Sequence, residues 1–148
     1  MRFVFYIVCL AALVLYPGRP LAEEKNANGP AVIYEEYNDM VIAGMSFEKE
    51  KTYFSERKLD TLDQKIKDMM ERTGKTRQEV IKLYQSVSEG TAKCRDIALE
   101  SKEIEGDTAM LTYTQTDTCN PDNTPGPQKV RMIYENGVWK IDEIVIDL

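Results

Sequence analysis

The fold is decided by a stretch near the end of the chain, Val130-Arg131-Met132-Ile133-Tyr134-Glu135-Asn136-Gly137-Val138-Trp139-Lys140-Ile141. Apolar and polar residues alternate on both sides of Asn136-Gly137. This dipeptide is the strongest short signal for a two-residue hairpin turn, because both of its residues tolerate positive φ. The turn sets Tyr134 opposite Trp139. We therefore predict two antiparallel strands, over 128–135 and 138–148, with one buried face.

A second hairpin is predicted directly upstream. Gly106-Asp107 separates two alternating runs, 93–104 and 108–118. In the later run the inward set is Ala109, Leu111 and Tyr113. Residues 120–127 are rich in proline and asparagine, so we expect a loop between the hairpins. The four runs together predict a mainly antiparallel sheet of about four strands.

One bulge is expected in the last strand. Ile144 and Ile146 have the opposite parity to Ile141, so an extra residue must enter the pairing between them. The sequence places this bulge near Asp142 and Glu143, where the strand is expected to bend.

Cys94 and Cys119 are predicted to form a disulfide. They lie at nearly equal distances from the Gly106 turn, which places them opposite each other on neighbouring strands. Ile97 and Leu99 alternate with the opposite parity to Cys94. Either a bulge lies between them, or the bridge lies beyond the regular ladder.

Helices are expected before the sheet. Gly29-Pro30 is a typical helix start, and residues 31–45 carry apolar residues at helical spacing, with a tyrosine-rich face. Ser46 can cap a second, short helix. The first helix is expected to weaken at Gly44.

Two longer helices follow in the prediction. Asp60 can cap a helix that stops near Gly74. Thr76-Arg77-Gln78-Glu79 is a capping box, which predicts a further helix ending near Gly90. Its inward side is expected to hold Val80, Leu83, Tyr84 and Val87.

The N-terminus is typical of a secretory signal peptide. Met1-Arg2 precedes an apolar run, 3–16, that is too short for a bilayer span of about 20 residues. We expect cleavage near Ala22, a disordered linker over 23–29 and one α+β domain over 30–148. The mature protein is then exported, to a periplasm or outside the cell, and has no stable membrane span.

Charge and composition exclude several classes of function. Loss of Arg2 and Arg19 changes the net charge from −6 to −8, which disfavours binding to nucleic acid. The chain has no histidine, which excludes serine or cysteine nucleophiles activated by an imidazole and histidine-containing zinc sites. We predict no cofactor, no metal and no catalytic residue, and favour a binding or interaction domain over an enzyme.

Helices followed by a curved antiparallel sheet that ends in Asn136-Gly137-Val138-Trp139-Lys140-Ile141 resemble the nuclear-transport-factor-2-like, or cystatin-like, superfamily. More narrowly, the chain is similar to small exported bacterial domains of unknown function in that group. The other places of resemblance are the first helix with Gly44, residues 47–55, and the turn at 105–109. The resemblance implies a cone formed by a bent sheet around the first helix, whose mouth often holds a small ligand. The segment 60–90 departs from the pattern and could cover or fill the cone.

Three functions follow as hypotheses. The first is a non-catalytic binding domain, monomeric or homodimeric, that holds a small apolar ligand or peptide in a pocket lined by aromatic residues: Tyr34, Tyr37, Tyr113, Tyr134 and Trp139. The second is an inhibitor or immunity protein that binds a basic partner protein. The third is a cone-pocket isomerase or hydrolase with Asp39 or Asp117 as base and a tyrosine as donor. The loop after Asp117 also offers oxygen ligands for a weak calcium site, although their spacing departs from the calcium-loop pattern: Asp117, Asn120, Asp122 and Asn123.

Overall fold

The computed structural model describes residues 29–123 and 126–146. The helices come first: α1 (Pro30–Ile42), α2 (Phe47–Lys51), α3 (Glu56–Thr73) and α4 (Arg77–Lys93). The strands follow: β1 (Arg95–Glu105), β2 (Thr108–Asp117), β3 (Pro127–Glu135) and β4 (Val138–Ile146). This confirms the α+β class. The predicted signal peptide and nearly all of the linker lie outside the described residues.

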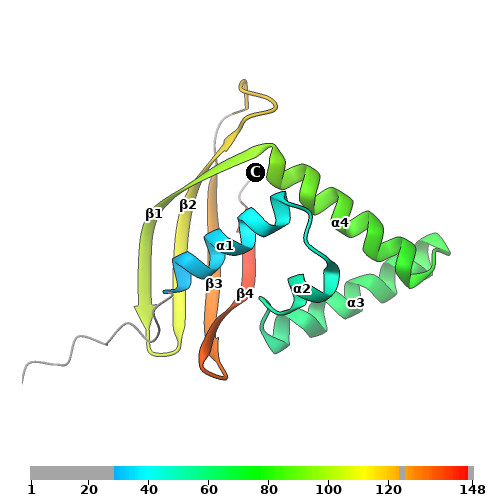
Figure 1. Cartoon of the computed structure of the whole chain (residues 1–148), viewed down its shortest axis with the longest axis horizontal. Helices are drawn as coiled ribbons and strands as arrows, with labels where there is room; N and C mark the ends of the chain where they lie inside the picture. Colours follow the sequence, from blue (N-terminus) through cyan, green and yellow to red (C-terminus); the bar gives the residue numbers. More distant parts are fainter. Residues whose placement is uncertain (1–28, 124–125, 147–148) are drawn as a thin grey trace, which may run out of the picture.

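The strands form one antiparallel sheet in the order β1-β2-β3-β4. Figure 1 shows α1 lying across one face of this open, curved sheet, while α3 and α4 extend away from it as a helical hairpin. None of the described helices is long and apolar enough to span a membrane. The molecule therefore has two parts with different packing: α1 on the sheet, and the hairpin beside them.

The main core lies between α1 and the sheet. The predicted inward residues of β2 have no exposed surface, and α1 covers them with its tyrosine-rich face. Burial of this face supplies the main driving force for folding. The core cluster consists of Ala31, Tyr34, Tyr37, Val41, Tyr53, Phe54, Ala109, Leu111, Tyr113, Val130, Met132, Trp139 and Ile141.

The β3–β4 hairpin follows the sequence prediction. Asn136 and Gly137 both have positive φ, 53° and 83°, as a type I′ turn requires. Tyr134 pairs with Trp139. The register shifts between Arg131 and Met132, which leaves Asp142 as the bulged residue. The predicted bulge is confirmed.

The disulfide is also confirmed. The Cys94 and Cys119 Cα atoms are 5.0 Å apart and the sulfurs are bonded. The ladder begins with Arg95 opposite Asp117, so the bridge lies just beyond it, as the second of the two alternatives requires. The register of the β1–β2 strand pair shifts at another place, between Leu99 and Ser101.

Two helix boundaries differ from the sequence prediction. α3 begins at Glu56 rather than near Asp60, because the buried Ser55 caps it and accepts a hydrogen bond from the Lys58 backbone at 3.1 Å. α4 continues through Gly90 to Lys93. Packing of Ala92 against the main core outweighs the cost of about 1 kcal/mol for a glycine inside a helix.

Fewer side chains of α4 are buried than the sequence predicted. Val80 is buried, at 1 % exposure, but Leu83 and Val87 are 45 % and 59 % exposed. α4 packs against α3 through a narrow stripe around Val80 and also contacts α1 and β1, and these neighbours leave the Leu83 and Val87 side chains exposed.

Candidate functional site

The five aromatic residues predicted to line a pocket pack mainly on one another. Tyr34, Tyr37, Tyr113 and Trp139 are buried, and Tyr134 is half-buried. Ring centroids are 5.2 Å apart for Tyr34 and Tyr113 and 5.3 Å apart for Tyr134 and Trp139, distances that are typical of aromatic packing. These side chains occupy the hollow between α1 and the sheet. A ligand pocket among them stays a prediction.

A pocket of about 200 Å³ lies instead between α3 and α4. Phe54 lines it together with one face of α3, where residues three and four apart point the same way. Most of its surface is apolar. The other lining residues are Lys58, Thr61, Leu62, Lys65, Ile66, Met69, Val80 and Tyr84.

A small second core supports this pocket. Phe47 from α2, Ile66 from α3 and Val80 from α4 are buried together, and Met69 and Tyr84 pack against them. Other apolar residues of the two helices, Leu59, Leu62 and Ala92, pack against the main core. The pocket exists because this core joins the helices at its base but does not fill the space along α3.

A buried carboxylate lies next to the pocket wall. Glu50 is 2 % exposed and accepts hydrogen bonds from the hydroxyls of Tyr37 at 3.1 Å and Tyr84 at 2.8 Å. Burial raises the pKa of Glu50, and the two hydroxyl donors and the charge of Lys58 offset only part of this effect. Burial also raises the pKa of both tyrosines. Tyr84 thus belongs both to the pocket lining and to the hydrogen bonds of Glu50.

Lys58 and Lys65 are the charged residues of the pocket lining. The Lys58 ammonium lies 5.0 Å from the centre of the Phe54 ring. Burial lowers the pKa of Lys58, and the like charge of Lys65 lowers it further, against the attraction of carboxylates such as Glu50. Within the described residues neither lysine forms an ion pair, whereas Lys67 on the same helix lies 2.8 Å from Asp63.

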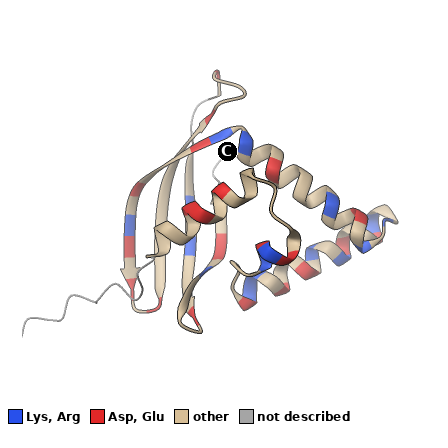
Figure 2. Cartoon of the chain, in the orientation of Figure 1, with Lys and Arg blue, Asp and Glu red and all other residues tan. Residues whose placement is uncertain are grey.

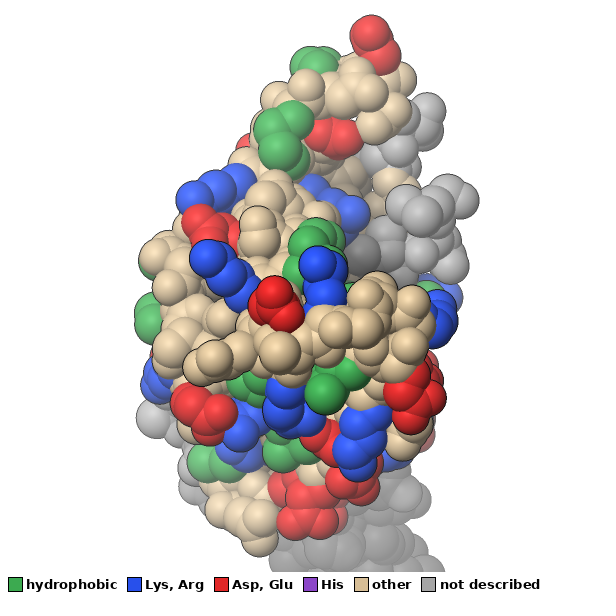
Figure 3. All heavy atoms as spheres, turned by 90° about the vertical axis from the view of Figure 1, so that its right-hand side faces the viewer, with side chains coloured by type: hydrophobic (Ala, Val, Ile, Leu, Met, Phe, Trp, Pro, Cys, Tyr) green, Lys and Arg blue, Asp and Glu red, His purple; other side chains and the backbone are tan. Residues whose placement is uncertain are grey.

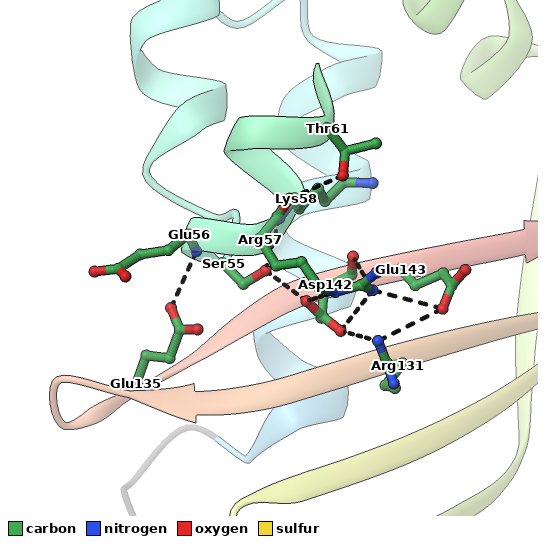
Figure 4. A network of polar contacts seen from close by, with 9 residues as sticks. All are labelled: Ser55, Glu56, Arg57, Lys58, Thr61, Arg131, Glu135, Asp142 and Glu143. Atoms are coloured by element: carbon green, nitrogen blue, oxygen red, sulfur yellow. Dashed lines mark hydrogen bonds and ion pairs between the residues drawn. The ribbon is translucent and has the colours of Figure 1, made fainter. Parts of the chain in front are cut away.

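A different carboxylate joins the helical hairpin to the sheet. The Asp142 side chain, 5 % exposed, accepts hydrogen bonds from Ser55 Oγ at 2.7 Å and from Arg57 Nε at 2.9 Å. Arg131 Nη2 lies 2.5 Å from its second oxygen. Figure 4 shows these groups converging on Asp142 from α3 and β3, with Glu143 beside them.

The cations around Asp142 decide its ionisation. Burial alone would raise the pKa of Asp142, but the hydrogen bonds from Arg57 and Ser55 and the charge of Arg131 outweigh it and lower the pKa to about 2. The backbone reinforces this contact, since Ser55 N–H donates to the carbonyl of Ile141 at 2.9 Å. The bulge thus acts as an anchor for the start of α3.

The two aspartates considered as catalytic bases have surroundings different from those of Asp142. Asp39 is exposed. Asp117 accepts hydrogen bonds from the backbone of Cys119 and Asn120 and from the Asn123 amide, and these bonds lower its pKa. It organises the loop after β2. Over the described part of the chain, no cluster of three or more histidine, cysteine or acidic side chains is placed to hold a metal ion.

Charge is distributed unevenly over the elements. Figure 2 marks acidic residues on α1, and both acidic and basic residues along β1, α3 and α4. In Figure 3 the free end of the helical hairpin presents both signs side by side. The basic residues of α3 and α4 are thus interrupted by carboxylates.

The sequence did not identify the residues of the α3–α4 pocket as a site. Glu50 belongs to the run Phe47-Glu48-Lys49-Glu50-Lys51, which has the composition of an exposed helix. Only its contacts with Tyr37 and Tyr84, 13 and 34 residues away, distinguish it from its neighbours. The available signal was weak: a tyrosine on the same side of α4 as Val80.

Comparison with known proteins places the chain in no family. No family model matches it, and no curated protein matches it. Among solved structures, the intermembrane-space region of the chloroplast protein ARC6 aligns over 77 % of this chain and 90 % of that chain, with 13 % identity and a TM-score of 0.27. A likeness at this level carries no argument about function.

Proposed function

We propose that the protein is a non-catalytic, exported binding domain that holds a small apolar ligand between α3 and α4. The observation that carries this proposal is the pocket itself, which is lined mainly by apolar side chains and open along one face of α3. Pockets for drug-sized ligands have volumes of about 300–1,000 Å³, so a pocket of about 200 Å³ suits a smaller, elongated molecule.

The surroundings of Glu50 support binding rather than catalysis. A general base must reach its substrate within about 3 Å or through one water. The Glu50 carboxylate is enclosed, and its hydrogen bonds with Tyr37 and Tyr84 serve to hold the Tyr84 ring in the pocket wall. Its raised pKa therefore has a structural cause.

A pair of tryptophan variants tests this location. Thr61 lies exposed on the pocket rim, so Thr61→Trp should place an indole over the opening without disturbing the core. We expect calorimetric titration with octanol to show binding to the parent protein and at least a ten-fold loss in Thr61→Trp. Gln64→Trp, an exposed position of α3 outside the pocket, is the control. Equal affinity in all three proteins would contradict the proposal.

The proposal also includes export of the protein and a nuclear-transport-factor-2-like fold. The Cys94–Cys119 disulfide is expected of a protein that reaches an oxidising compartment. Helices packed on a curved antiparallel sheet are compatible with a nuclear-transport-factor-2-like domain. Export is tested by N-terminal sequencing of the mature protein, which should begin near Glu23. An uncleaved N-terminus would contradict it.

A second candidate function is binding of a basic protein at β1. This edge strand is exposed along almost its whole length. It carries four carboxylates, those of Asp96, Glu100, Glu103 and Glu105. These charges would attract a basic segment that pairs with β1 as an additional strand. Charge reversal of Glu103 and Glu105 to lysine should abolish capture of such a partner. Unchanged capture would remove this candidate.

A further inference from the structure

The charges at the α3–α4 pocket have one sign. Lys58 and Lys65 line it, and none of the other lining residues is acidic. The two lysines are seven residues apart on α3, which places them on the same side of the helix about 10 Å apart along its axis. Thr61 lies between them and its hydroxyl is already donated to the Arg57 carbonyl. The rim therefore offers two ammonium groups above an apolar floor.

These ammonium groups are placed at an electrostatic cost. Lys58 is half-buried and loses part of its hydration, and Lys65 carries a like charge on the same rim. The closest compensation comes from Glu50, which lies behind Tyr84 and is already bonded to two hydroxyls. An anion bound at the rim would offset both costs, because it would attract both lysines and accept their hydrogen bonds.

We propose that the ligand is an amphipathic anion, a short alkyl carboxylate, whose chain lies between α3 and α4 and whose carboxylate is held by Lys58 and Lys65. This inference rests on the proposed function, since it names the ligand class for the same pocket. The chain contacts the floor formed by Ile66, Met69 and Val80. The pocket volume of about 200 Å³ restricts the ligand to a short chain.

A neutral or a positively charged head group fits the pocket rim less well than a carboxylate. A neutral alcohol would bury apolar surface but add no negative charge at the rim. An alkyl amine would add a third positive charge to the same rim. The expected order of affinity is therefore carboxylate, then alcohol, then amine, for tails of equal length.

Calorimetric titrations with octanoate, octanol and octylamine at neutral pH test this order. We expect octanoate to bind at least ten-fold more tightly than octanol. Lys58→Gln should lower octanoate affinity about ten-fold, because its hydrogen bond to a charged group is partly buried. Lys65→Gln should lower it about three-fold, because this lysine is exposed. Neither variant should change octanol affinity by more than about two-fold.

Lys67→Gln is the matched control. Lys67 lies on α3 near Lys65 but pairs with Asp63 and does not line the pocket, so octanoate affinity should be unchanged. Thermal unfolding verifies that each variant is folded. Should Lys58→Gln unfold, the exposed Lys65 still decides the question.

The outcomes separate the two proposals. Equal binding of octanoate and octanol, with no effect of either lysine variant, would overturn the anionic ligand and leave the apolar pocket intact. Tighter binding of octylamine would overturn it as well. Failure of all three probes to bind would overturn both the pocket assignment and this inference.

Discussion

Two carboxylates are buried in the described part of the chain, Asp142 in the sheet and Glu50 on α2, and they are held in opposite ways. Asp142, where the sheet meets α3, is surrounded by Arg57, Arg131 and a serine hydroxyl, and its pKa is lowered to about 2. Glu50, beside the helical hairpin, receives only the hydroxyls of tyrosines, and burial raises its pKa. The surroundings of Asp142 stabilise its charged form, whereas those of Glu50 destabilise it.

The difference shows how each part is built. At the bulge, cations from two elements converge on one anion, which fixes α3 to the sheet. In the hairpin, the nearest cation, Lys58, is left at the pocket rim and does not pair with Glu50 within the described residues. We therefore interpret the first cluster as structural, and the second as the wall of a site whose counter-charge comes from a ligand.

The largest expected effect concerns the covalent link between the two parts. The disulfide joins the end of α4 to the end of β2 across 25 residues. Replacing both Cys94 and Cys119 by alanine should lower the free energy of unfolding by about 3–4 kcal/mol, because the unfolded chain regains loop entropy. Urea unfolding measures this loss. A change below about 1 kcal/mol would contradict this prediction, and would show that packing and the Asp142 contacts hold the two parts together without the bridge.

Removing the anion at the bulge should have the next largest effect. Asp142→Asn removes the buried anion that Arg57 and Arg131 share, leaves them the more exposed Glu143, and should cost about 2–3 kcal/mol in urea unfolding. Glu143→Gln is the control: this half-exposed carboxylate lies 3.6 Å from Arg57 and should cost under about 1 kcal/mol. Equal losses in the two variants would mean that burial does not distinguish them.

Lowering the pH should remove the charge of Asp142 without a mutation. The folded pKa of Asp142 lies below its ordinary value of 3.8, so its contribution is present above that pH and is lost as the pH falls toward about 2. We expect the unfolding free energy of the parent to fall over this window by more than that of Asp142→Asn. Parallel acid profiles of parent and variant would contradict the lowered pKa.

The smallest effect should have the opposite sign. Because the folded pKa of Glu50 is raised, its ionisation opposes folding as the pH rises from the ordinary value of 4.5 through the folded pKa. Glu50→Gln keeps the acceptor for both tyrosine hydroxyls, so it should stabilise the protein at neutral pH by about 1 kcal/mol. Thermal melts from acidic to neutral pH should show the gain growing with pH.

The control for this prediction lies two residues away. Glu48 is on the same short helix, exposed, and paired with Lys51 at 2.7 Å. Glu48→Gln should therefore leave stability almost unchanged at every pH. A loss of stability in Glu50→Gln at neutral pH would show that Glu50 is held as an anion after all.

The sheet was predictable from the sequence because its signals are local. The Asn136-Gly137 turn sets the register of β3 and β4, and the parity change after Ile141 placed the bulge correctly. The capping box at Thr76 and the stop at Gly74 were likewise correct. Each of these features depends on residues within a few positions of one another.

The α3–α4 pocket was not predictable for the opposite reason. Ser55 begins α3 because its side chain meets Asp142, 87 residues further along the chain. The pocket depends on the direction in which the hairpin leaves the sheet, and this also exposes Leu83 and Val87. Tyr34 and Tyr113, which the sequence assigned to a ligand pocket, lie in the core with their ring centroids 5.2 Å apart. Periodicity identifies an apolar side chain but not the surface that covers it.

Methyl-resolved NMR during titration with octanoate tests the central claim most directly, because it compares the two parts in one experiment. We predict saturating shifts for the methyl groups of Leu62, Ile66, Met69 and Val80, with Val130, Met132 and Ile141 in the sheet unchanged. Shifts confined to the sheet core would place the ligand beneath α1 and contradict the account. The absence of saturating shifts anywhere would contradict it equally.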